Sequence, residues 1–202
     1  MIRVAVFASG RGSNLEALFD ALERRRDAAI VLVASDRADA PALDRARRRG
    51  VEAAVVDAGD AAGMLAALDR AEVDWIVLAG YLKRVPGDVV RRYPSRILNI
   101  HPALLPAHGG KGMYGERVHA AVLKAGEKVS GASVHLVDEE YDRGPVVARE
   151  EVPVEPGDSP ATLAARVLEV EHRLLPAVVI AAAEGRIRME GDRAWIEEPE
   201  RR

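Results

Sequence analysis

The sequence contains no cysteine, which excludes disulfides, thiolate catalysis and cysteine-based metal sites. It also has no apolar run long enough to cross a bilayer. The segment Met1–Val4 already has the pattern of a strand, and no signal-peptide pattern precedes it. The net charge of −3 gives no overall positive field for nucleic acid or an anionic membrane. These absences predict a cytoplasmic protein that binds neither nucleic acid nor membrane.

The composition is that of a globular protein with a sizeable core. Hydrophobic residues make up 49% of the 202 residues and charged residues 30%. There is no internal repeat, linker or low-complexity tract, so we expect one domain over residues 1–202. The short basic runs Arg24–Arg26 and Arg47–Arg49 are typical of solvated helix ends, where the helix dipole favours cations.

Short β-branched runs alternate with longer segments of helical period, which is typical of stacked βα units. The predicted strands are Ile2–Ala8, Ala29–Ala34, Ala53–Asp57, Trp75–Ala79, Ile97–Ile100, Ser133–Val137 and Val146–Val152. The predicted helices are Asn14–Arg26, Pro41–Arg49, Ala61–Ala71, Gly87–Tyr93, Gly115–Ala125 and Pro160–Glu184.

The strands are continuous apolar runs, as expected when helices cover both faces of a sheet. The pattern therefore predicts an α/β fold: a single Rossmann-like domain with a mostly parallel twisted sheet and helices on both faces. Ser159 is placed to cap the last long helix, and Pro176 predicts a kink or break within it. Residues 186–196 are expected to form a small hairpin around Gly191.

A glycine-rich loop follows the first predicted strand, in the sequence Ser9-Gly10-Arg11-Gly12-Ser13-Asn14-Leu15. Amides at the start of a helix, together with hydroxyl and amide side chains, can bind a phosphate. The spacing matches neither the dinucleotide fingerprint nor the P-loop, so a single phosphate fits better. The alternative is a plain turn in which Ser13 or Asn14 caps the helix.

The segment Ile97-Leu98-Asn99-Ile100-His101-Pro102 places two polar side chains at the end of a strand. Asn99 and His101 are two residues apart, so they point to the same face, and Pro102 keeps His101 out of the helical conformation. An amide donor beside an imidazole can stabilise an oxyanion and transfer a proton. The alternative is a hydrogen-bonded structural histidine.

Four segments occur in an order that resembles the folate-dependent formyltransferases, most closely the branch that acts on glycinamide ribonucleotide. The resemblance extends over nearly the whole chain, to about Trp195. The Asn-x-His-Pro and Asp-x-Gly-Pro signals belong to the superfamily, and the Ser-Gly-x-Gly-Ser-Asn-Leu loop narrows it to this branch. The segments are Ala8–Leu15, Leu78–Tyr81, Leu98–Pro106 and Asp138–Pro145.

The resemblance implies transfer of the formyl group of 10-formyltetrahydrofolate to the amine of glycinamide ribonucleotide, without a metal. Asn99 matches the oxyanion donor and His101 the protonated partner and proton shuttle. Asp142 matches the carboxylate that raises the histidine's pKa and orients the ring. Without the resemblance, Asp142 would be interpreted as a turn residue.

The resemblance also assigns the binding residues. Gly12, Ser13 and Asn14 match the phosphate site, and Glu171 matches the glutamate that holds the glycinamide end. As an isolated helical residue, Glu171 would be expected to face solvent, and Lys83 and Arg84 could equally be surface charges. The residues expected to bind 10-formyltetrahydrofolate are Leu82, Lys83, Arg84, Val85, Asn99, Val137, Asp138, Glu139 and Tyr141.

The sequence departs from the family pattern in two places. Many members carry an arginine near the start of the third helix that reaches the folate, and Asp57–Met64 contains none. The loop His108–Gly115 resembles a variant branch, and its four glycines predict a mobile lid that closes over the ligands. Lys111 in this loop could contact an anionic group or solvent. His119 and His135 are interpreted as structural.

Other functions fit the sequence less well. The deformylases that share the Asn, His and Asp set carry an N-terminal regulatory domain, and a first strand at Ile2 leaves no room for one. Methionyl-tRNA formyltransferases add a basic C-terminal domain, whereas this chain ends after Glu197-Glu198-Pro199-Glu200. A non-catalytic nucleotide-binding module would not need Asn99, His101 and Asp142 together. His101 and Asp142 could coordinate a metal, but the sequence shows no third ligand for it. We expect a monomer or a homodimer.

Overall fold

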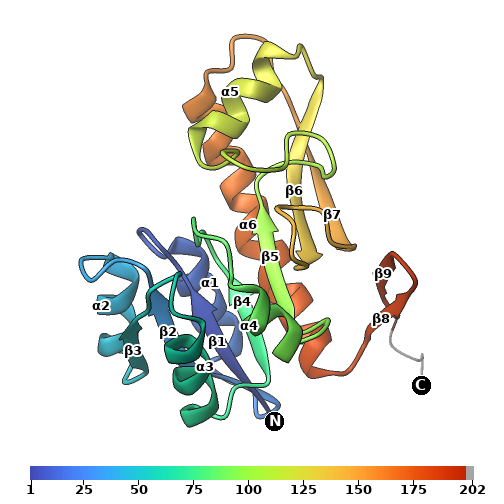
Figure 1. Cartoon of the computed structure of the whole chain (residues 1–202). Helices are drawn as coiled ribbons and strands as arrows, with labels where there is room; N and C mark the ends of the chain where they lie inside the picture. Colours follow the sequence, from blue (N-terminus) through green and yellow to red (C-terminus); the bar gives the residue numbers. More distant parts are fainter. Residues whose placement is uncertain (199–202) are drawn as a thin grey trace. The chain divides into compact units, whose positions relative to one another are not determined.

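The computed structural model describes residues 1–198 (Figure 1). Residues 199–202, including Pro199 and Glu200 of the predicted C-terminal tail, lie outside the described residues. The chain forms two compact units, Met1–Asn99 and a second that begins at Ile100. The strand order of the main sheet is β3-β2-β1-β4-β5-β6-β7. The chain passes from the first unit to the second within β5.

The first unit consists of alternating strands and helices. β1 pairs in parallel with both β2 and β4, β2 with β3, and β4 with β5. The predicted mostly parallel α/β architecture is thereby confirmed. The elements are β1 (Ile2–Phe7), α1 (Ser13–Leu22), β2 (Ala28–Ser35), α2 (Pro41–Arg48), β3 (Glu52–Val55), α3 (Ala61–Arg70), β4 (Trp75–Leu78), α4 (Gly87–Arg92) and β5 (Ile97–His101).

The second unit has an antiparallel strand pair, two helices and a C-terminal hairpin. β6 and β7 pair in antiparallel orientation, and β8 and β9 form a separate two-stranded sheet. Its elements are α5 (Glu116–Lys124), β6 (Val129–Leu136), β7 (Val146–Pro153), α6 (Pro160–Ala183), β8 (Ile187–Glu190) and β9 (Arg193–Ile196).

β1 is the centre of the first unit because it has a hydrogen-bonded strand on each side. Its residues Val4–Phe7 are fully buried, which is why the strand is a continuous apolar run with no alternation. α1 contributes an apolar stripe at the i, i+3, i+4 and i+7 positions, formed by buried Leu15, Leu18, Phe19 and Leu22. This packing fixes the loop that joins β1 to α1.

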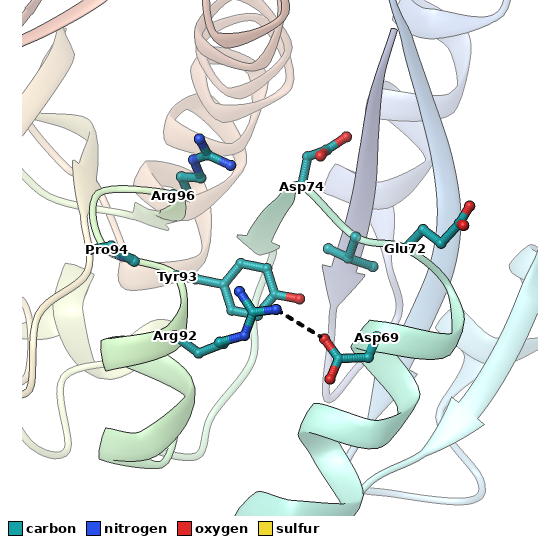
Figure 2. A pocket seen from close by; sticks show the side chains of 8 residues that line it. Asp69, Glu72, Asp74, Arg92, Tyr93, Pro94 and Arg96 are labelled. Carbon is teal, nitrogen blue, oxygen red and sulfur yellow. Dashed lines mark ion pairs between the residues drawn. The ribbon is translucent and has the colours of Figure 1, made fainter.

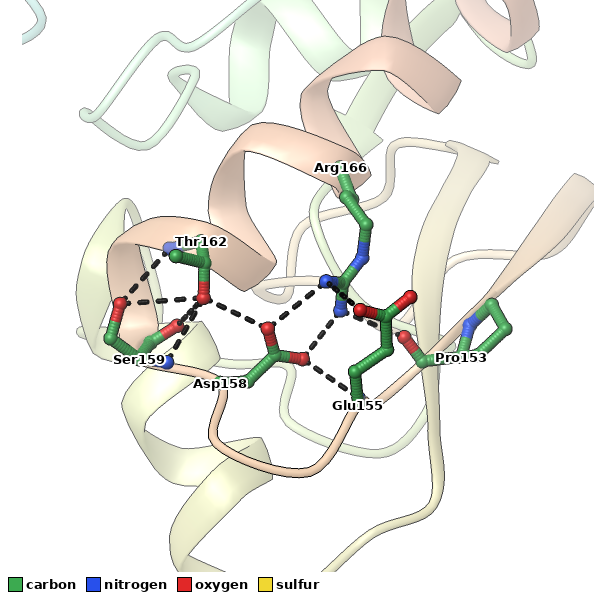
Figure 3. Close-up of polar contacts among 6 residues, drawn as sticks. All are labelled: Pro153, Glu155, Asp158, Ser159, Thr162 and Arg166. Atoms are coloured by element: carbon green, nitrogen blue, oxygen red, sulfur yellow. Dashed lines mark hydrogen bonds and ion pairs between the residues drawn. The ribbon is translucent and has the colours of Figure 1, made fainter.

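α6 begins with a complete capping box. The Ser159 hydroxyl accepts a hydrogen bond from the Thr162 amide, and the Thr162 hydroxyl accepts one from the Ser159 amide. Figure 3 shows that Arg166 reaches back from the helix to the Asp158 carboxylate and to the Pro153 carbonyl. The Arg166 guanidinium holds the pKa of Asp158 well below its usual range. Together these contacts fix the connection from β7 to α6.

Three element predictions need correction or refinement. Pro176 does not break α6, which is continuous from Pro160 to Ala183. Pro176 removes one backbone hydrogen bond, but buried Leu174, Leu175, Val178 and Val179 hold the helix in place on both sides. β6 begins at Val129, four residues earlier than predicted, because Gly131 masks the strand pattern. An added Cβ on Gly131 would lie 2.1 Å from the Glu150 carbonyl oxygen of β7.

The third refinement concerns the end of α1, whereas the prediction for the C-terminal hairpin agrees with the structure. α1 ends at Leu22 and not at Arg26, since Arg25 turns to form a two-pronged ion pair with Asp27 at the start of β2. The predicted C-terminal hairpin is confirmed, with Gly191 at the turn in the left-handed region (φ 56°). Glycine adopts this conformation without steric cost.

Loss of the α6 cap should destabilise the protein. Ser159→Ala removes the acceptor for the Thr162 amide, and we expect the free energy of unfolding to fall by about 1 kcal/mol. Ser159→Asn, which keeps a capping acceptor, should lie close to the wild type. Urea denaturation of the three proteins measures this, and equal stability of Ser159→Ala and the wild type would contradict it.

Candidate functional site

The glycine-rich loop after β1 is a helix N-terminus in which glycine is required. Gly12 is the N-cap of α1 with a left-handed backbone (φ 75°), and no side chain caps this end of the helix. An added Cβ on Gly12 would lie 3.0 Å from the Ala42 Cβ. The alternative interpretation, in which Ser13 or Asn14 serves as the cap, is therefore wrong. Ser13 is instead the first residue of the helix, and Asn14 is buried in its first turn.

α2 holds this loop from outside. Arg45 donates from Nε to the Arg11 carbonyl at 2.8 Å and from Nη1 to Glu16 at 2.7 Å. The Ala42 amide donates to the Gly10 carbonyl at 3.2 Å. Hydrogen bonds from Arg45 and Arg49 lower the pKa of Glu16, so the carboxylate stays charged and the tether persists. The loop is thus preorganised before any ligand binds.

The predicted folate segment follows β4 in the same unit. Leu82, Lys83 and Arg84 are exposed, whereas Val85 is buried. Lys83 lines a cavity of about 380 Å³, and its other lining residues follow β2 and β3. This cavity lies where ligands bind in open α/β sheets, outside the carboxyl ends of the strands. The other lining residues are Asp36, Val55, Val56, Asp57 and Ala58.

His101, the last residue of β5, has an acceptor at each ring nitrogen. Its Nε2 lies 2.9 Å from the His108 carbonyl oxygen, which requires Nε2 to carry the hydrogen. Its Nδ1 lies 3.6 Å from Asp142 Oδ2. The side chain is only 3% exposed. Donation toward both acceptors at once would require the imidazolium form of the ring.

Asp142 is positioned by groups from two other segments and by the backbone of its own loop. The Gly110 amide donates to Oδ2 at 2.8 Å, and His135 Nε2 lies 3.5 Å from Oδ1. The backbone of Asp142 is left-handed (φ 54°), which is uncommon for a residue other than glycine. An added Cβ on Gly144 would lie 1.9 Å from the Leu136 carbonyl oxygen. The glycine of the Asp-x-Gly-Pro motif is needed because the loop returns this closely to β6.

Burial and charge act on the two groups in opposite directions. Burial lowers the pKa of His101 more than the Asp142 carboxylate and the His108 carbonyl raise it, so the net direction is downward. The Asp142 carboxylate opposes this downward shift of the pKa, but burial has the larger effect. For Asp142, burial alone would raise the pKa. The hydrogen bond from His135, the charge of His101 and the Gly110 amide together outweigh burial, and the pKa is lowered.

His135 lies beside Asp142, next to His101. The sequence analysis interpreted His135 as structural and did not predict this contact. Its Nδ1 donates to the Leu136 carbonyl at 2.9 Å, which turns Nε2 toward Asp142. The signal that could have identified it is a histidine in an apolar strand shortly before the Asp-x-Gly-Pro motif. His119 is also buried, within α5.

The other predicted residues lie as follows. Glu171 is buried in α6 at 9% exposed, contrary to the solvent-facing position expected of an isolated helical glutamate. Asn99 lies two residues before His101 in β5. Val137 and Asp138 are half-buried, and Glu139 and Tyr141 are exposed. The structure brings His101 and Asp142 together in the second unit, while Gly12–Asn14 and Leu82–Val85 belong to the first.

A larger cavity of about 640 Å³ lies elsewhere in the first unit (Figure 2). Asp74 and Arg96, which line it, immediately precede β4 and β5. Its opening is therefore at the amino ends of the strands, opposite to the usual ligand side. Arg92 and Asp69 form an ion pair of 3.6 Å across it. The predicted site residues do not line this cavity.

Residues 1–198 contain no group of three or more His, Asp or Glu side chains arranged to hold a metal ion. Within the same range, no helix is both long and apolar enough to span a membrane.

The chain matches the formyl transferase family model over residues 2–179. The match includes the loop after β1, the Asn-x-His-Pro segment and the Asp-x-Gly-Pro segment. The chain belongs to the formyl transferase family. The resemblance identified from the sequence is confirmed.

Two curated relatives carry the same name. Phosphoribosylglycinamide formyltransferase of Escherichia coli (strain K12) is 36% identical over 204 residues, covering 97% of this chain and 94% of that protein. The chloroplastic phosphoribosylglycinamide formyltransferase of Arabidopsis thaliana is 41% identical over 199 residues, covering 94% of this chain and 68% of that protein. Other relatives are much longer: the chain spans 19% of the trifunctional purine biosynthetic protein adenosine-3 of Gallus gallus.

The fold agrees with solved structures of the family. Glycinamide ribonucleotide transformylase 1 from Symbiobacterium toebii has a TM-score of 0.91 and 41% identity, covering 98% of this chain and 95% of that chain. A formyltetrahydrofolate deformylase from Pseudomonas syringae has a TM-score of 0.87 at 24% identity, covering 98% of this chain and 66% of that one. This second likeness shows the fold alone.

Replacing the Asp142 carboxylate should change the titration of His101. Because the carboxylate raises the histidine's pKa, Asp142→Asn should shift that pKa further down. NMR titration of the histidine ring protons measures the shift. Glu140→Gln removes an exposed carboxylate from the same loop and should leave the His101 titration in place. An unchanged or raised pKa in Asp142→Asn would contradict the pairing.

Proposed function

We propose that this chain transfers the formyl group of 10-formyltetrahydrofolate to the amine of glycinamide ribonucleotide, in purine synthesis. The observation that carries the proposal is the buried His101 ring, which has an oxygen acceptor at Nε2 and the Asp142 carboxylate at Nδ1. Family membership and relatives named for this activity support it. The products are formylglycinamide ribonucleotide and tetrahydrofolate.

In the proposed reaction, the substrate amine attacks the formyl carbon and the formyl oxygen gains negative charge. Asn99 and protonated His101 donate hydrogen bonds to this oxygen. In this structure the His108 carbonyl oxygen accepts from Nε2 at 2.9 Å, so the formyl oxygen would take the place of this carbonyl when the loop that carries His108 moves. Preorganised donors of this kind are worth roughly 3–4 kcal/mol of barrier.

The proton balance assigns the role of Asp142. The attacking amine loses a proton and the leaving folate nitrogen gains one, so the site must accept and return a proton as the carbon–nitrogen bond breaks. Protonated His101 gives its proton to the leaving folate nitrogen as the carbon–nitrogen bond breaks, and the neutral ring then takes up the proton that the attacking amine loses. The Asp142 carboxylate stabilises the charged form, and the Gly110 amide and His135 hold the carboxylate in place.

The binding roles follow the same proposal. The first turn of α1, at Gly12, Ser13 and Asn14, receives the phosphate of the ribonucleotide. The Glu171 carboxylate, buried in α6, is proposed to hold the glycinamide amine. The residues proposed to contact 10-formyltetrahydrofolate are Leu82, Lys83, Arg84, Val85, Asn99, Val137, Asp138, Glu139 and Tyr141.

We further propose that the chain acts as one catalytic domain in the cytoplasm, as a monomer or homodimer, and that the reaction needs no metal. The loop Gly109–Gly112 is proposed to act as the lid. His108 and Gly110 tie this loop to His101 and Asp142, so its position is linked to the reacting groups.

The decisive test is formyl transfer by the purified protein, with and without glycinamide ribonucleotide. Release of tetrahydrofolate that depends on the ribonucleotide, with formylated product, is the expected result. Release without the ribonucleotide would instead assign deformylase activity. No release in either case, with the ribonucleotide still bound, would indicate a binding module or a different acceptor amine.

Variants of the proton-carrying pair should lose turnover. His101→Ala and Asp142→Asn should each lower kcat by roughly a hundredfold or more, with folding intact. Glu140→Gln, in the same loop as Asp142, should keep normal turnover. Steady-state kinetics with circular dichroism as a folding check measures the effect. Near-normal kcat in either variant would remove that residue from the mechanism.

The phosphate site should affect one substrate. Ser13→Ala combined with Asn14→Ala should raise KM for glycinamide ribonucleotide and leave KM for 10-formyltetrahydrofolate largely unchanged, because only the ribonucleotide carries a phosphate. Initial rates at varied concentrations of each substrate separate the two constants. An equal rise in both would argue against the phosphate assignment.

A further inference from the structure

The hydroxyl of Ser9 joins three loops at the carboxyl ends of the strands of the first unit. Ser9 is the second residue after the end of β1, and it is buried, with 3% of its surface exposed. Its Oγ donates to Asp36 Oδ1 at 2.5 Å, in the loop after β2. It accepts from the Leu82 amide at 2.9 Å, in the loop after β4. One buried hydroxyl therefore contacts all three loops.

The geometry gives this hydroxyl a single orientation. A serine hydroxyl has one hydrogen to donate, and here it is directed to a carboxylate, which makes a stronger hydrogen bond than a neutral acceptor. The Leu82 amide approaches the oxygen from the other loop. Rotation of the hydroxyl would break a buried hydrogen bond, so a shift of Asp36 or Leu82 is transmitted to Ser9.

The strand ends do not need this hydroxyl to stay together. Backbone hydrogen bonds already join them, from the Ala8 amide to the Ala34 carbonyl at 2.9 Å and from the Ser9 amide to the Gly80 carbonyl at 3.0 Å. Ser35, which ends β2, gives a contrast. Its hydroxyl is also buried and accepts an amide hydrogen bond at 3.1 Å, but from Arg37 of its own loop.

The contacts of Ser9 lie next to both proposed binding segments. Ser9 is adjacent to Gly10 and the phosphate loop, and Leu82 is the first residue of the folate segment. Asp36 and Lys83 line the same cavity of about 380 Å³. The hydroxyl thus lies between the segment proposed for one substrate and the segment proposed for the other.

We propose that Ser9 is a positioning residue that couples the binding of the two substrates. This inference rests on the proposed function. When the ribonucleotide phosphate binds at the loop after Gly10, a shift of Ser9 is transmitted through its hydroxyl to Asp36 and to Leu82 at the start of the folate segment. Coupling between two sites is reciprocal, so the folate must tighten ribonucleotide binding by the same factor.

Isothermal titration calorimetry with glycinamide ribonucleotide and tetrahydrofolate tests the coupling, because tetrahydrofolate carries no formyl group and no reaction occurs. In the wild type, each ligand should lower the Kd of the other by about fivefold or more. In Ser9→Ala the factor should fall to about one. Asp36→Ala, which removes the hydroxyl's acceptor, should reduce it as well, and the double variant should lose no more than Ser9→Ala alone.

Ser35→Ala is the matched control. It removes a buried hydroxyl with an amide partner from the neighbouring strand end and should keep the wild-type coupling. In kinetics, Ser9→Ala should raise KM for both substrates with kcat retained, unlike the phosphate-site variant, which affects one. If Ser9→Ala does not fold, the half-exposed Asp36 provides the test, since its truncation leaves the strand ends intact.

The outcomes separate the two proposals. Wild-type coupling that persists in both Ser9→Ala and Asp36→Ala overturns the role of Ser9, as does binding of both ligands to the wild type without coupling. Loss of coupling in Ser35→Ala as well would make the effect a general one of buried hydroxyls and would also overturn it. Failure of the wild type to bind either ligand overturns the proposed function itself.

Discussion

Parallel pairing of β1 with β2 on one side and β4 on the other is the constraint on which the first unit depends. Strands that run in the same direction end at the same edge, so the loops after β1, β2 and β4 meet there. The fully buried run Val4–Phe7 enforces this arrangement because a one-residue slip would misalign its contacts on both faces. The glycine-rich loop and the Leu82 segment are neighbours for this reason.

In the second unit, the comparable constraint is electrostatic. His101 lies in a buried position that disfavours its charge, and Asp142 and the His108 carbonyl favour it. Burial has the larger effect, so the pKa of His101 is lowered, while Asp142 and the His108 carbonyl oppose that shift. The balance depends on backbone geometry, because the left-handed Asp142 and the close approach of Gly144 to Leu136 aim the carboxylate.

The loop after β1 and the Asp142 carboxylate are both held in place by contacts from neighbouring segments. Arg45 holds the Arg11 carbonyl and Glu16, and the Gly110 amide and His135 hold Asp142. None of these supporting groups needs to touch a substrate to matter, since they fix the residues that are proposed to do so. Ser9 extends the principle, because its partners belong to loops proposed for different ligands. Preorganisation of this kind lowers the cost of ordering a site when ligands bind.

Local patterns in the sequence were sufficient to predict the architecture, and the family resemblance assigned the pair of His101 and Asp142. Short apolar runs that alternate with helical segments predicted every strand of the main sheet. The Asn-x-His-Pro and Asp-x-Gly-Pro segments carry the resemblance that assigned His101 and Asp142. The break that Pro176 could have caused does not occur, because the effect of Pro176 on α6 depends on the burial of its neighbours, and that burial is a property of packing. The predicted strand for β6 began too late, at Ser133, because Gly131 interrupts the strand pattern.

The sequence by itself therefore determined the features that depend on periodicity, turn chemistry and motif spacing, which are the strands, the helices and the C-terminal hairpin. Tertiary structure alone decided the roles of His135, Arg45, Ser9 and Asp36. The partners of Arg45, Ser9 and Asp36 lie far along the chain. It also decided the balance of charge at His101, because a pKa depends on which groups surround the ring and how much water reaches it. Those distances exist only once the chain has folded.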